Sequence, residues 1–293
     1  MHRPFLLLVG ATCVALADLC SCAPPVAPPR NPATVSPAPV VDDAALALFA
    51  ERNVTGSFVL LDLASGAQTI VGRDDAARGH LPCSTFKIPN TLIGLETGVI
   101  PDEHFTLPWD GKKGWIDDWN RDHDLASAMR YSVVWYYQEV ARRIGQERMT
   151  LWVHKLQYGN ESTAGGIDRF WLDADVGDKG AAGGGLRISA LQQVDFLRRL
   201  RTGALPVRPE NAGLVMRILP AKWVGTSVVR GKTGLGRAGG KSIGWLVGYA
   251  ERGDRVWVYA THVESSADDM ERLMPLRREL THALLARYGV ANP

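Results

Sequence analysis

The sequence is short of cysteine and of net charge, and both shortages narrow what the protein can be. Three of its four cysteines (Cys13, Cys20 and Cys22) lie in the first 22 positions, which leaves only Cys83 for the body of the chain. No disulfide can therefore form within that body. The 33 basic and 31 acidic residues give a net charge of +2, and there is no long basic run. This balance argues against a nucleic-acid partner.

Metal-ligand spacing and long apolar runs are missing as well. The seven histidines show no pattern such as H-E-x-x-H, so the sequence disfavours a zinc-dependent hydrolase and predicts no metal. The apolar run from Phe5 to Leu16 is too short for a transmembrane span. No internal repeat is evident. A 293-residue chain that is 46% hydrophobic is large enough for one sizeable core, or for two subdomains that share one.

Residues 1–22 are typical of an export signal. His2 and Arg3 form a short basic start, the apolar run follows, and small residues come next. Two interpretations stay open: cleavage after Ala17 with plain secretion, or a lipoprotein signal that leaves a lipid anchor on Cys22. Both predict an exported, periplasmic protein, and the second predicts one tethered to a membrane.

Residues 23–41 contain seven prolines and almost nothing that could form a core. This stretch is predicted to be an extended, disordered tether. The folded, catalytic part is then expected at 42–293.

The body shows strand patterns at both ends and a mainly helical stretch, about 84–218, between them. Strands are predicted at 56–63, 67–71, 226–233, 242–250 and 255–263. Helices are predicted around 44–51, over 133–144, after the N-cap Ser189 and over 276–288. This order favours an α+β fold, an antiparallel sheet with a helical subdomain inserted and a cleft between the two.

The tetrapeptide Ser84-Thr85-Phe86-Lys87 is the first candidate for chemistry. If it opens a helix, Ser84 and Lys87 lie on one face, and the amine can approach the hydroxyl. A neutral, desolvated lysine can take the proton of a serine and turn it into a nucleophile. The neighbouring Cys83 is more simply a small buried residue at a helix entrance than a second nucleophile.

Three further motifs follow in order along the chain: Ser132-Val133-Val134, Tyr158-Gly159-Asn160 and Lys232-Thr233-Gly234. The last ends a predicted strand, where it could pair with an amide-like substrate and hold a carboxylate. Taken singly, each could be a turn or a hairpin end. A dinucleotide fingerprint at Gly234-x-Gly236-x-x-Gly239 is set aside, because a strand rather than a helix follows it, and a flexible loop is expected there.

Together these motifs resemble the class D serine β-lactamases, the oxacillinase family of penicillin-recognising serine acyl-transferases. Phe170-Trp171-Leu172 and Arg277 also match family positions, and the similarity extends over about residues 42–290. One departure is Leu235, where an aromatic residue is common. The resemblance implies the fold described above, flanked by N- and C-terminal helices, and small β-lactam substrates.

The resemblance also implies a role for each matched residue. Ser84 would be the nucleophile, and Lys87 would act as N6-carboxylysine, formed from carbon dioxide or bicarbonate with no dissociable cofactor. Ser132 and Lys232 would pass a proton to the leaving nitrogen. The remaining assignments are substrate binding for Thr233, Gly234, Leu235 and Arg277, a carbamate pocket of Val134, Trp171 and Leu172, and a structural role for Tyr158, Gly159 and Asn160.

Two alternatives share the Ser-x-x-Lys and Lys-Thr-Gly patterns. One is a penicillin-binding transpeptidase or carboxypeptidase, which deacylates poorly with β-lactams, and the other is a β-lactam sensor domain that stays acylated. A sensor is expected to be joined to transmembrane helices and a protease module, which this sequence does not show. The sequence does not predict the spectrum of β-lactams or the oligomeric state.

Overall fold

The computed structural model describes residues 37–114, 116–172, 185–266 and 268–291. Ser36–Pro293 forms one compact unit, distinct from Met1–Val35. The predicted export signal and most of the predicted tether lie outside the described residues. The strands are β1 (Val40–Val41), β2 (Thr55–Asp62), β3 (Gln68–Val71), β4 (Ala221–Val224), β5 (Ser227–Ala238), β6 (Lys241–Arg252) and β7 (Arg255–Ser266).

Helices occupy both flanks of the sheet and most of the middle of the chain. The α-helices are α1 (Ala47–Ala50), α2 (Arg73–Ala77), α3 (Lys87–Glu96), α4 (Leu125–Tyr131), α5 (Val134–Ile144), α6 (Gln146–Lys155), α7 (Ala190–Thr202), α8 (Pro209–Ile218) and α9 (Met270–Arg287). The 3₁₀ helices are η1 (Asp43–Leu46), η2 (Cys83–Phe86) and η3 (Asp117–Trp119).

The strands form a single sheet in the order β1-β3-β2-β7-β6-β5-β4. Every neighbouring pair is antiparallel except β1 with β3, which is parallel. The α+β class predicted from the sequence is confirmed. Val40 and Val41 pair with Thr69 and Ile70, so the tether predicted at 23–41 extends too far into the fold. β-branched residues pair readily along a sheet edge, and the prolines before them hid this signal.

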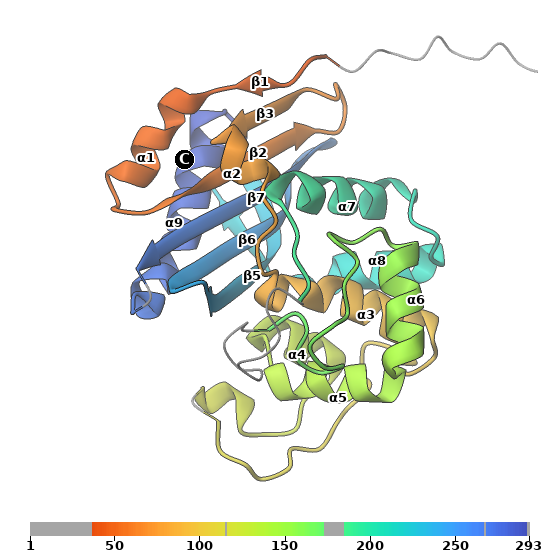
Figure 1. The fold of residues 1–293 in the computed structure, drawn as a ribbon. Coiled ribbons are helices and arrows are strands. Elements are labelled where there is room, and N and C mark those ends of the chain that lie inside the picture. Colours follow the sequence, from red (N-terminus) through yellow and green to blue (C-terminus); the bar gives the residue numbers. More distant parts are fainter. Residues whose placement is uncertain (1–36, 115, 173–184, 267, 292–293) are drawn as a thin grey trace, which may run out of the picture. The chain divides into compact units, whose positions relative to one another are not determined.

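Each face of the sheet is covered by helices (Figure 1). On one face, α9 and α1 bury a core that includes Phe49, Phe58 and Leu280. On the other face lie α2, α7 and η2, which connect the sheet to the core of the helical region. The active-site candidate Ser84 therefore sits on a short helix that packs against the sheet.

Helices α3, α5, α6 and α8 pack on one another within the predicted helical stretch. Helix α7 differs, because it packs against β2 and β7 on the sheet although its sequence lies inside the predicted range 84–218. Ser189 caps α7 as predicted, and it forms a capping box with Gln192. The helical stretch thus supplies both a separate layer and one cover of the sheet.

Strand β5 continues to Ala238, past the point where the sequence analysis ended it. The flexible loop predicted at Gly234–Gly239 is therefore wrong for most of its length, and only Gly239–Gly240 form the turn to β6. A Cβ at Gly236 would lie 2.7 Å from Cys83 Sγ, and one at Gly234 would lie 3.0 Å from the Pro82 carbonyl oxygen. These glycines let the strand approach η2 closely.

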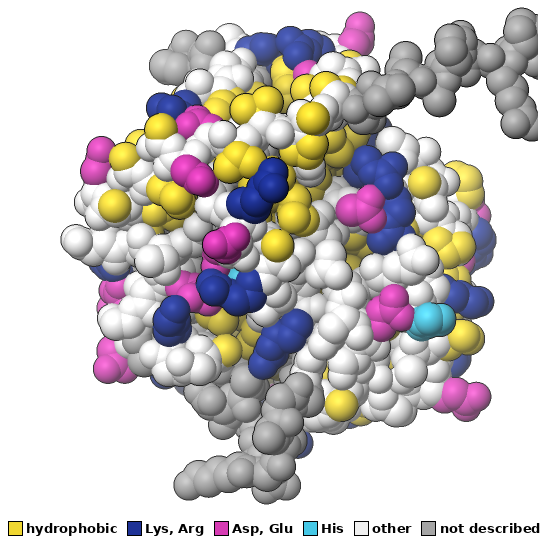
Figure 2. Space-filling view, turned by 45° about the horizontal axis from the view of Figure 1, so that its top comes forward, with side chains coloured by type: hydrophobic (Ala, Val, Ile, Leu, Met, Phe, Trp, Pro, Cys, Tyr) yellow, Lys and Arg dark blue, Asp and Glu magenta, His cyan; other side chains and the backbone are white. Residues whose placement is uncertain are grey.

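The molecular surface carries charges of both signs. Figure 2 shows basic and acidic side chains interspersed with apolar ones on the face in view. Within the described residues, no helix is both long enough and apolar enough to span a membrane.

Candidate active site

Ser84 and Lys87 lie at the two ends of a tight turn. Cys83, with φ 51°, begins η2, and α3 begins at Lys87. In a 3₁₀ turn the residues i and i+3 eclipse each other. Lys87 Nζ accordingly donates a hydrogen bond of 2.8 Å to Ser84 Oγ. The approach of amine and hydroxyl predicted from the sequence is confirmed.

Lys87 is completely buried, and no carboxylate acts to raise its pKa. Burial disfavours the charged amine and lowers the pKa of Lys87 from 10.5 to about 7. Its Nζ lies 5.4 Å from the centroid of the Tyr137 ring. A substantial fraction of the amine is therefore neutral near pH 7.

Trp171 supplies an unpaired donor in this buried region. Its indole stacks on Phe86, the residue before Lys87, with ring centroids 5.2 Å apart. The Trp171 Nε1–H is buried and has no hydrogen-bond partner among the residues that the structure describes. A buried donor without a partner costs free energy, so this N–H is available to an added acceptor. Val134 and Leu172, also predicted for this pocket, are half-buried.

A second serine–lysine pair lies between the helical region and the sheet. Ser132 follows α4 in the left-handed conformation, with φ 58°, and its Oγ accepts a 2.8 Å hydrogen bond from Lys232 Nζ. Lys232 is buried on β5 and also donates to the Thr233 carbonyl at 3.0 Å. Burial lowers the pKa of Lys232 well below its usual value, and the charge of Lys87 lowers it further. The two lysines are thus electrostatically coupled.

Arg277 projects from α9 to the strand that carries the Lys-Thr-Gly motif. Arg277 is 5% exposed, and its guanidinium donates to the carbonyl of Gly234. Burial lowers the pKa of Arg277 to about 9, and within the described part of the chain its Nε has no hydrogen-bond partner. Arg277 is therefore buried within the fold rather than exposed at its surface. Leu235, the next residue on β5, is half-buried.

The Tyr158-Gly159-Asn160 motif joins the helical region to the segment before α7. Tyr158 packs edge-on against Phe86, and Asn160 Oδ1 accepts from Arg187 N at 2.9 Å. A Cβ at Gly159, where φ is 62°, would lie 2.1 Å from the Arg187 carbonyl oxygen. Tyr158 therefore packs on the nucleophile turn, and Asn160 fixes the position of the segment before α7.

Two further anchors of the nucleophile turn have no signal in the sequence. Trp245 Nε1, on β6, donates to the Leu81 carbonyl at 2.9 Å. Gln193, on α7, donates to Thr85 Oγ1 at 2.8 Å. Each partner is more than a hundred residues away along the chain, and neither stands in a motif, so only the fold reveals them.

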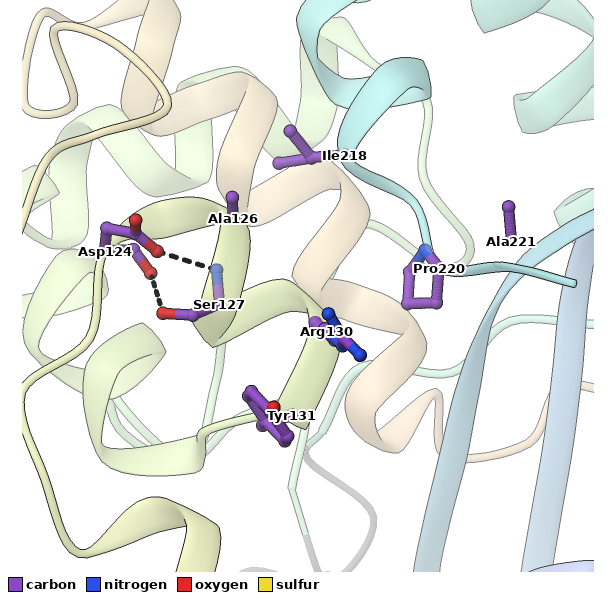
Figure 3. A pocket seen from close by; sticks show the side chains of 8 residues that line it. All are labelled: Asp124, Ala126, Ser127, Arg130, Tyr131, Ile218, Pro220 and Ala221. Atoms are coloured by element: carbon purple, nitrogen blue, oxygen red, sulfur yellow. Dashed lines mark hydrogen bonds between the residues drawn. The ribbon is translucent and has the colours of Figure 1, made fainter.

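A cavity opens beside the Lys232–Thr233 strand. Its volume is about 240 Å³, and it shares three residues (Arg130, Pro220 and Ala221) with a neighbouring hollow of about 670 Å³. Figure 3 shows this second hollow, with Asp124 and Ser127 from the start of α4 on one side and Ile218 and Pro220 on the other. Space for a small molecule therefore adjoins the second serine–lysine pair.

Comparison with known proteins agrees with this geometry. Residues 56–280 match the family described as the penicillin binding protein transpeptidase domain. The β-lactamase OXA-48 of Klebsiella pneumoniae is 42% identical over 215 residues, which is 73% of this chain and 76% of the relative. The chain belongs to the class D serine β-lactamases.

Solved structures of similar proteins share the fold. A class D β-lactamase from Sebaldella termitidis has a TM-score of 0.79 and 32% identity, covering 87% of this chain and 99% of its own. The C-terminal domain of the Bacillus licheniformis BlaR penicillin-receptor has a TM-score of 0.77 and 28% identity, covering 86% and 97% of the two chains. Because the fold is also similar to that of a penicillin-receptor domain, turnover of a β-lactam is the property that distinguishes an enzyme from a receptor.

Proposed function

We propose that this class D β-lactamase hydrolyses β-lactam antibiotics through an acyl-enzyme on Ser84, with carboxylated Lys87 as the general base. One observation carries the mechanistic part. The amine of Lys87 is fully buried, lies 2.8 Å from Ser84 Oγ and has a pKa lowered to about 7. A group in this state can lose its proton at neutral pH and react with carbon dioxide.

The residues around Lys87 fit a carboxyl group. Trp171 offers the unpaired Nε1–H, and Phe86 and Tyr137 keep the region apolar. The carboxyl group would supply a carboxylate base beside Ser84 for both acylation and deacylation. Val134 and Leu172 would limit the access of water. The catalytic chemistry of this family needs no metal.

The other catalytic groups act on the substrate. Backbone N–H groups of Ser84 and Leu235 would stabilise the oxyanion that forms when Ser84 Oγ attacks the lactam carbonyl. Ser132, hydrogen-bonded to Lys232, would deliver a proton to the lactam nitrogen as the C–N bond breaks. Thr233 and Arg277 would bind the substrate carboxylate, because the buried guanidinium lies against the same strand.

The deciding experiment follows the protein and its product together. The purified protein is incubated with benzylpenicillin, and intact mass and hydrolysed product are recorded over time. Many product molecules per chain, with a transient adduct on Ser84, are expected. A persistent adduct without turnover would refute hydrolysis and indicate a receptor-like or transpeptidase-like protein.

The role of Lys87 needs its own controls. Carbon-13-labelled bicarbonate is expected to give a carbamate resonance that disappears in Lys87→Ala, together with turnover. Lys155→Ala, at an exposed lysine on α6, is the matched control and should retain both. Unchanged turnover in Lys87→Ala would contradict the proposed base.

We also propose that the protein works after export, in the periplasm. Support comes from the signal-like residues 1–22, and a lipid anchor at Cys22 would hold the enzyme at a membrane. Mass spectrometry of the mature N-terminus tests this: a diacylglyceryl adduct on Cys22 supports the anchor, and cleavage after Ala17 supports plain secretion.

A further inference from the structure

A buried cluster of two histidines and two carboxylates lies on the sheet side of the segment that leads to Ser84. Asp75 comes from α2, His80 from the stretch between α2 and η2, and His262 and Glu264 from β7. The histidines are 5% and 0% exposed, and Glu264 is 8% exposed. The sequence analysis missed this group because α2 and β7 are far apart along the chain, and only the fold brings them together.

Both ring nitrogens of His80 face hydrogen-bond acceptors. Nε2 lies 3.2 Å from Asp75 Oδ1 and 3.3 Å from the Asp75 backbone carbonyl oxygen, and Nδ1 lies 3.1 Å from Glu264 Oε1. Ionised carboxylates and carbonyls only accept hydrogen bonds, so both nitrogens must donate. An imidazole that donates from both nitrogens is the positively charged form.

His262 is the neutral member of the pair. Its ring stacks on that of His80 with centroids 3.7 Å apart, so a second positive charge would be strongly repelled. Its Nδ1 donates to Asp75 Oδ2 at 2.8 Å, and its Nε2 has no hydrogen-bond partner among the described residues. Burial lowers the pKa of His262, and the charge of His80 adds to this effect. The cluster therefore contains one imidazolium, at His80.

Three cations lie close to the cluster, and two of them bind its acids. Lys241 Nζ, on β6, donates to Glu264 Oε2 at 2.7 Å, and Arg78 binds Asp75. The third, Arg187, lies beside residue 79 and directs its guanidinium to a backbone carbonyl. The carboxylate oxygens that face His80 are thus left to the imidazolium.

The balance of these contacts favours the charged state of His80. Burial disfavours the imidazolium, but hydrogen bonds with Asp75 and Glu264 outweigh burial and raise the pKa of His80 to about 9. Hydrogen bonds from His80 and Lys241 in turn lower the pKa of Glu264 to about 2.

His80 also connects the chain before the nucleophile to its neighbours. Its backbone N–H donates to the Ile188 carbonyl at 2.9 Å, and its carbonyl accepts from the Ile188 N–H at 2.8 Å. The next residue, Leu81, accepts from Trp245 Nε1, whose ring lies edge-on to His80 with centroids 6.1 Å apart. Ser84 follows four positions after His80. The side chain of His80 thus anchors the start of the nucleophile segment through a charge.

We propose that His80 is a positioning residue for the attack by Ser84: its imidazolium, held between Asp75 and Glu264, fixes the start of the nucleophile segment, and loss of its proton in alkaline solution loosens that segment. The inference rests on the proposed acylation of Ser84. His80 is not one of the catalytic groups described above, so its effect reaches the reaction through the backbone. A small displacement of a nucleophile is enough to lower its rate of attack strongly.

The charge of His80 gives the fold a pH dependence in the alkaline range. Its pKa is raised from an ordinary value of 6.5 to about 9. The imidazolium therefore contributes its full stability below pH 6.5, and this contribution is lost as the pH rises to 9. Glu264→Gln removes the negative charge on one side of the ring, so the pKa of His80 should fall by about one to three units.

NMR titration of nitrogen-15-labelled histidines follows His80 without any substrate. The His80 signals are identified by their loss in His80→Gln. We expect a midpoint near pH 9 in the wild type and a lower one in Glu264→Gln, whose deficit in melting temperature should widen from pH 6.5 to 8.5. A wild-type midpoint at or below pH 6.5 would overturn the proposal, and this measurement decides even if the variant does not fold.

The kinetic test compares Glu264→Gln with the wild type at each pH, in saturating bicarbonate and with benzylpenicillin. The ratio of their kcat/KM values should fall about fivefold or more between pH 6.5 and 8.5, because His80 loses its charge in the variant first. Taking the ratio cancels the titrations of Lys87 and Lys232, which the two proteins share. A ratio that does not change with pH would reduce the cluster to packing and refute the positioning role.

His154→Gln is the matched control. This exposed histidine on α6 also pairs with a carboxylate, that of Glu161, so the ratio to the wild type should stay constant across the same pH range. An equal fall in the control would count against His80. If the protein does not turn over, the rate of adduct formation on Ser84, measured by intact mass, replaces kcat/KM, so a failure of hydrolysis is told apart from a failure of this proposal.

Discussion

Lys87 and Lys232 each donate a hydrogen bond to a serine hydroxyl, but neighbouring positive charges lower the pKa of Lys232 only. Lys87 has no basic group among the causes of its lowered pKa, whereas that of Lys232 is depressed in part by a charge on Lys87. When Lys87 is uncharged, this repulsion is absent and Lys232 holds its proton more readily. Loss of the charge on the first lysine thus favours the protonated form of the second, although burial of Lys232 remains the larger influence on its pKa.

The pKa of Lys87 predicts a pH dependence. Its ordinary value of 10.5 falls to about 7 in the fold, so the amine is increasingly protonated below pH 7 and can then neither accept a proton nor react with carbon dioxide. In buffers depleted of bicarbonate, kcat is expected to fall about tenfold per pH unit below that point. Steady-state rates from pH 5 to 8.5, with and without bicarbonate, measure this. A flat profile under depletion would contradict the assignment.

The indole N–H of Trp171 offers a narrower test. Trp171→Phe keeps an aromatic ring against Phe86 but removes the unpaired donor. We expect kcat to fall about tenfold or more, with partial recovery in added bicarbonate, because a charge-assisted hydrogen bond contributes about 1.5–3 kcal/mol.

Trp135→Phe is the matched control. Its Nε1 donates to the Trp119 carbonyl at 2.8 Å, on a half-buried part of α5, so this variant should leave the bicarbonate response unchanged. An equal loss in both variants would assign the effect to packing rather than to the N–H.

For individual residues, the sequence predicted the site residues that stand in motifs and missed those that contact the nucleophile turn from distant parts of the chain. Ser84 and Lys87 are close in sequence, so helical geometry brought them together. Trp245 and Gln193 reach the same turn from other elements, and their contacts depend on the register of β6 and the placement of α7. Such contacts follow from tertiary packing, which local patterns do not encode.

The contact between β5 and η2 is the element-scale feature on which the site depends. The strand passes so close to the turn that Gly234 and Gly236 have no space for ordinary side chains. Because these glycines have no Cβ atom, β5 can approach η2 closely enough for Lys232 and Ser84 to lie in the same site. The sequence pattern predicted a flexible loop here, because a strand rather than a helix follows the glycines, but strand β5 continues through them to Ala238.

Gly236→Ala is expected to separate these two elements. The new Cβ would meet Cys83 Sγ at 2.7 Å, so the strand or the turn must shift, at a cost of about 1–3 kcal/mol in stability. Turnover should fall about tenfold or more, because misplacement of reacting groups by fractions of an ångström is costly. Urea unfolding and kcat/KM measure the two effects.

Gly213→Ala provides the comparison. This glycine lies in α8, and nothing lies within 4 Å of the position that the alanine methyl group would occupy. Alanine should therefore raise stability by about 0.5–1 kcal/mol and leave turnover unchanged. Equal changes of stability and turnover in the two variants would show that the close contact between β5 and η2 is not needed for the site.

At the scale of the whole molecule, the structure predicts where the folded unit begins. A chain that starts at Ser36 should keep the stability and turnover of the full protein, because the compact unit spans Ser36–Pro293. A chain that starts at Thr55 loses β1, η1 and α1, and with them the buried Phe49, whose burial alone contributes about 1.5–3 kcal/mol. Urea unfolding of the two shortened chains should show a lower midpoint only for the one that starts at Thr55. Equal midpoints would show that β1 and α1 do not contribute to the stability of the fold.

The position of β2 in the sheet has a consequence for the order of events during folding. Thr55 pairs with Glu264 and Asp62 with Trp257. Strand β2, near the start of the chain, therefore cannot complete its pairing until β7, near the end of the chain, is available. Until β7 is in place, β2 presents an unpaired edge, and long-range pairing of this kind is slow. Because β7 and β6 lie between β2 and the Lys-Thr-Gly strand β5, the sheet that carries the site is complete only when β7 has joined it.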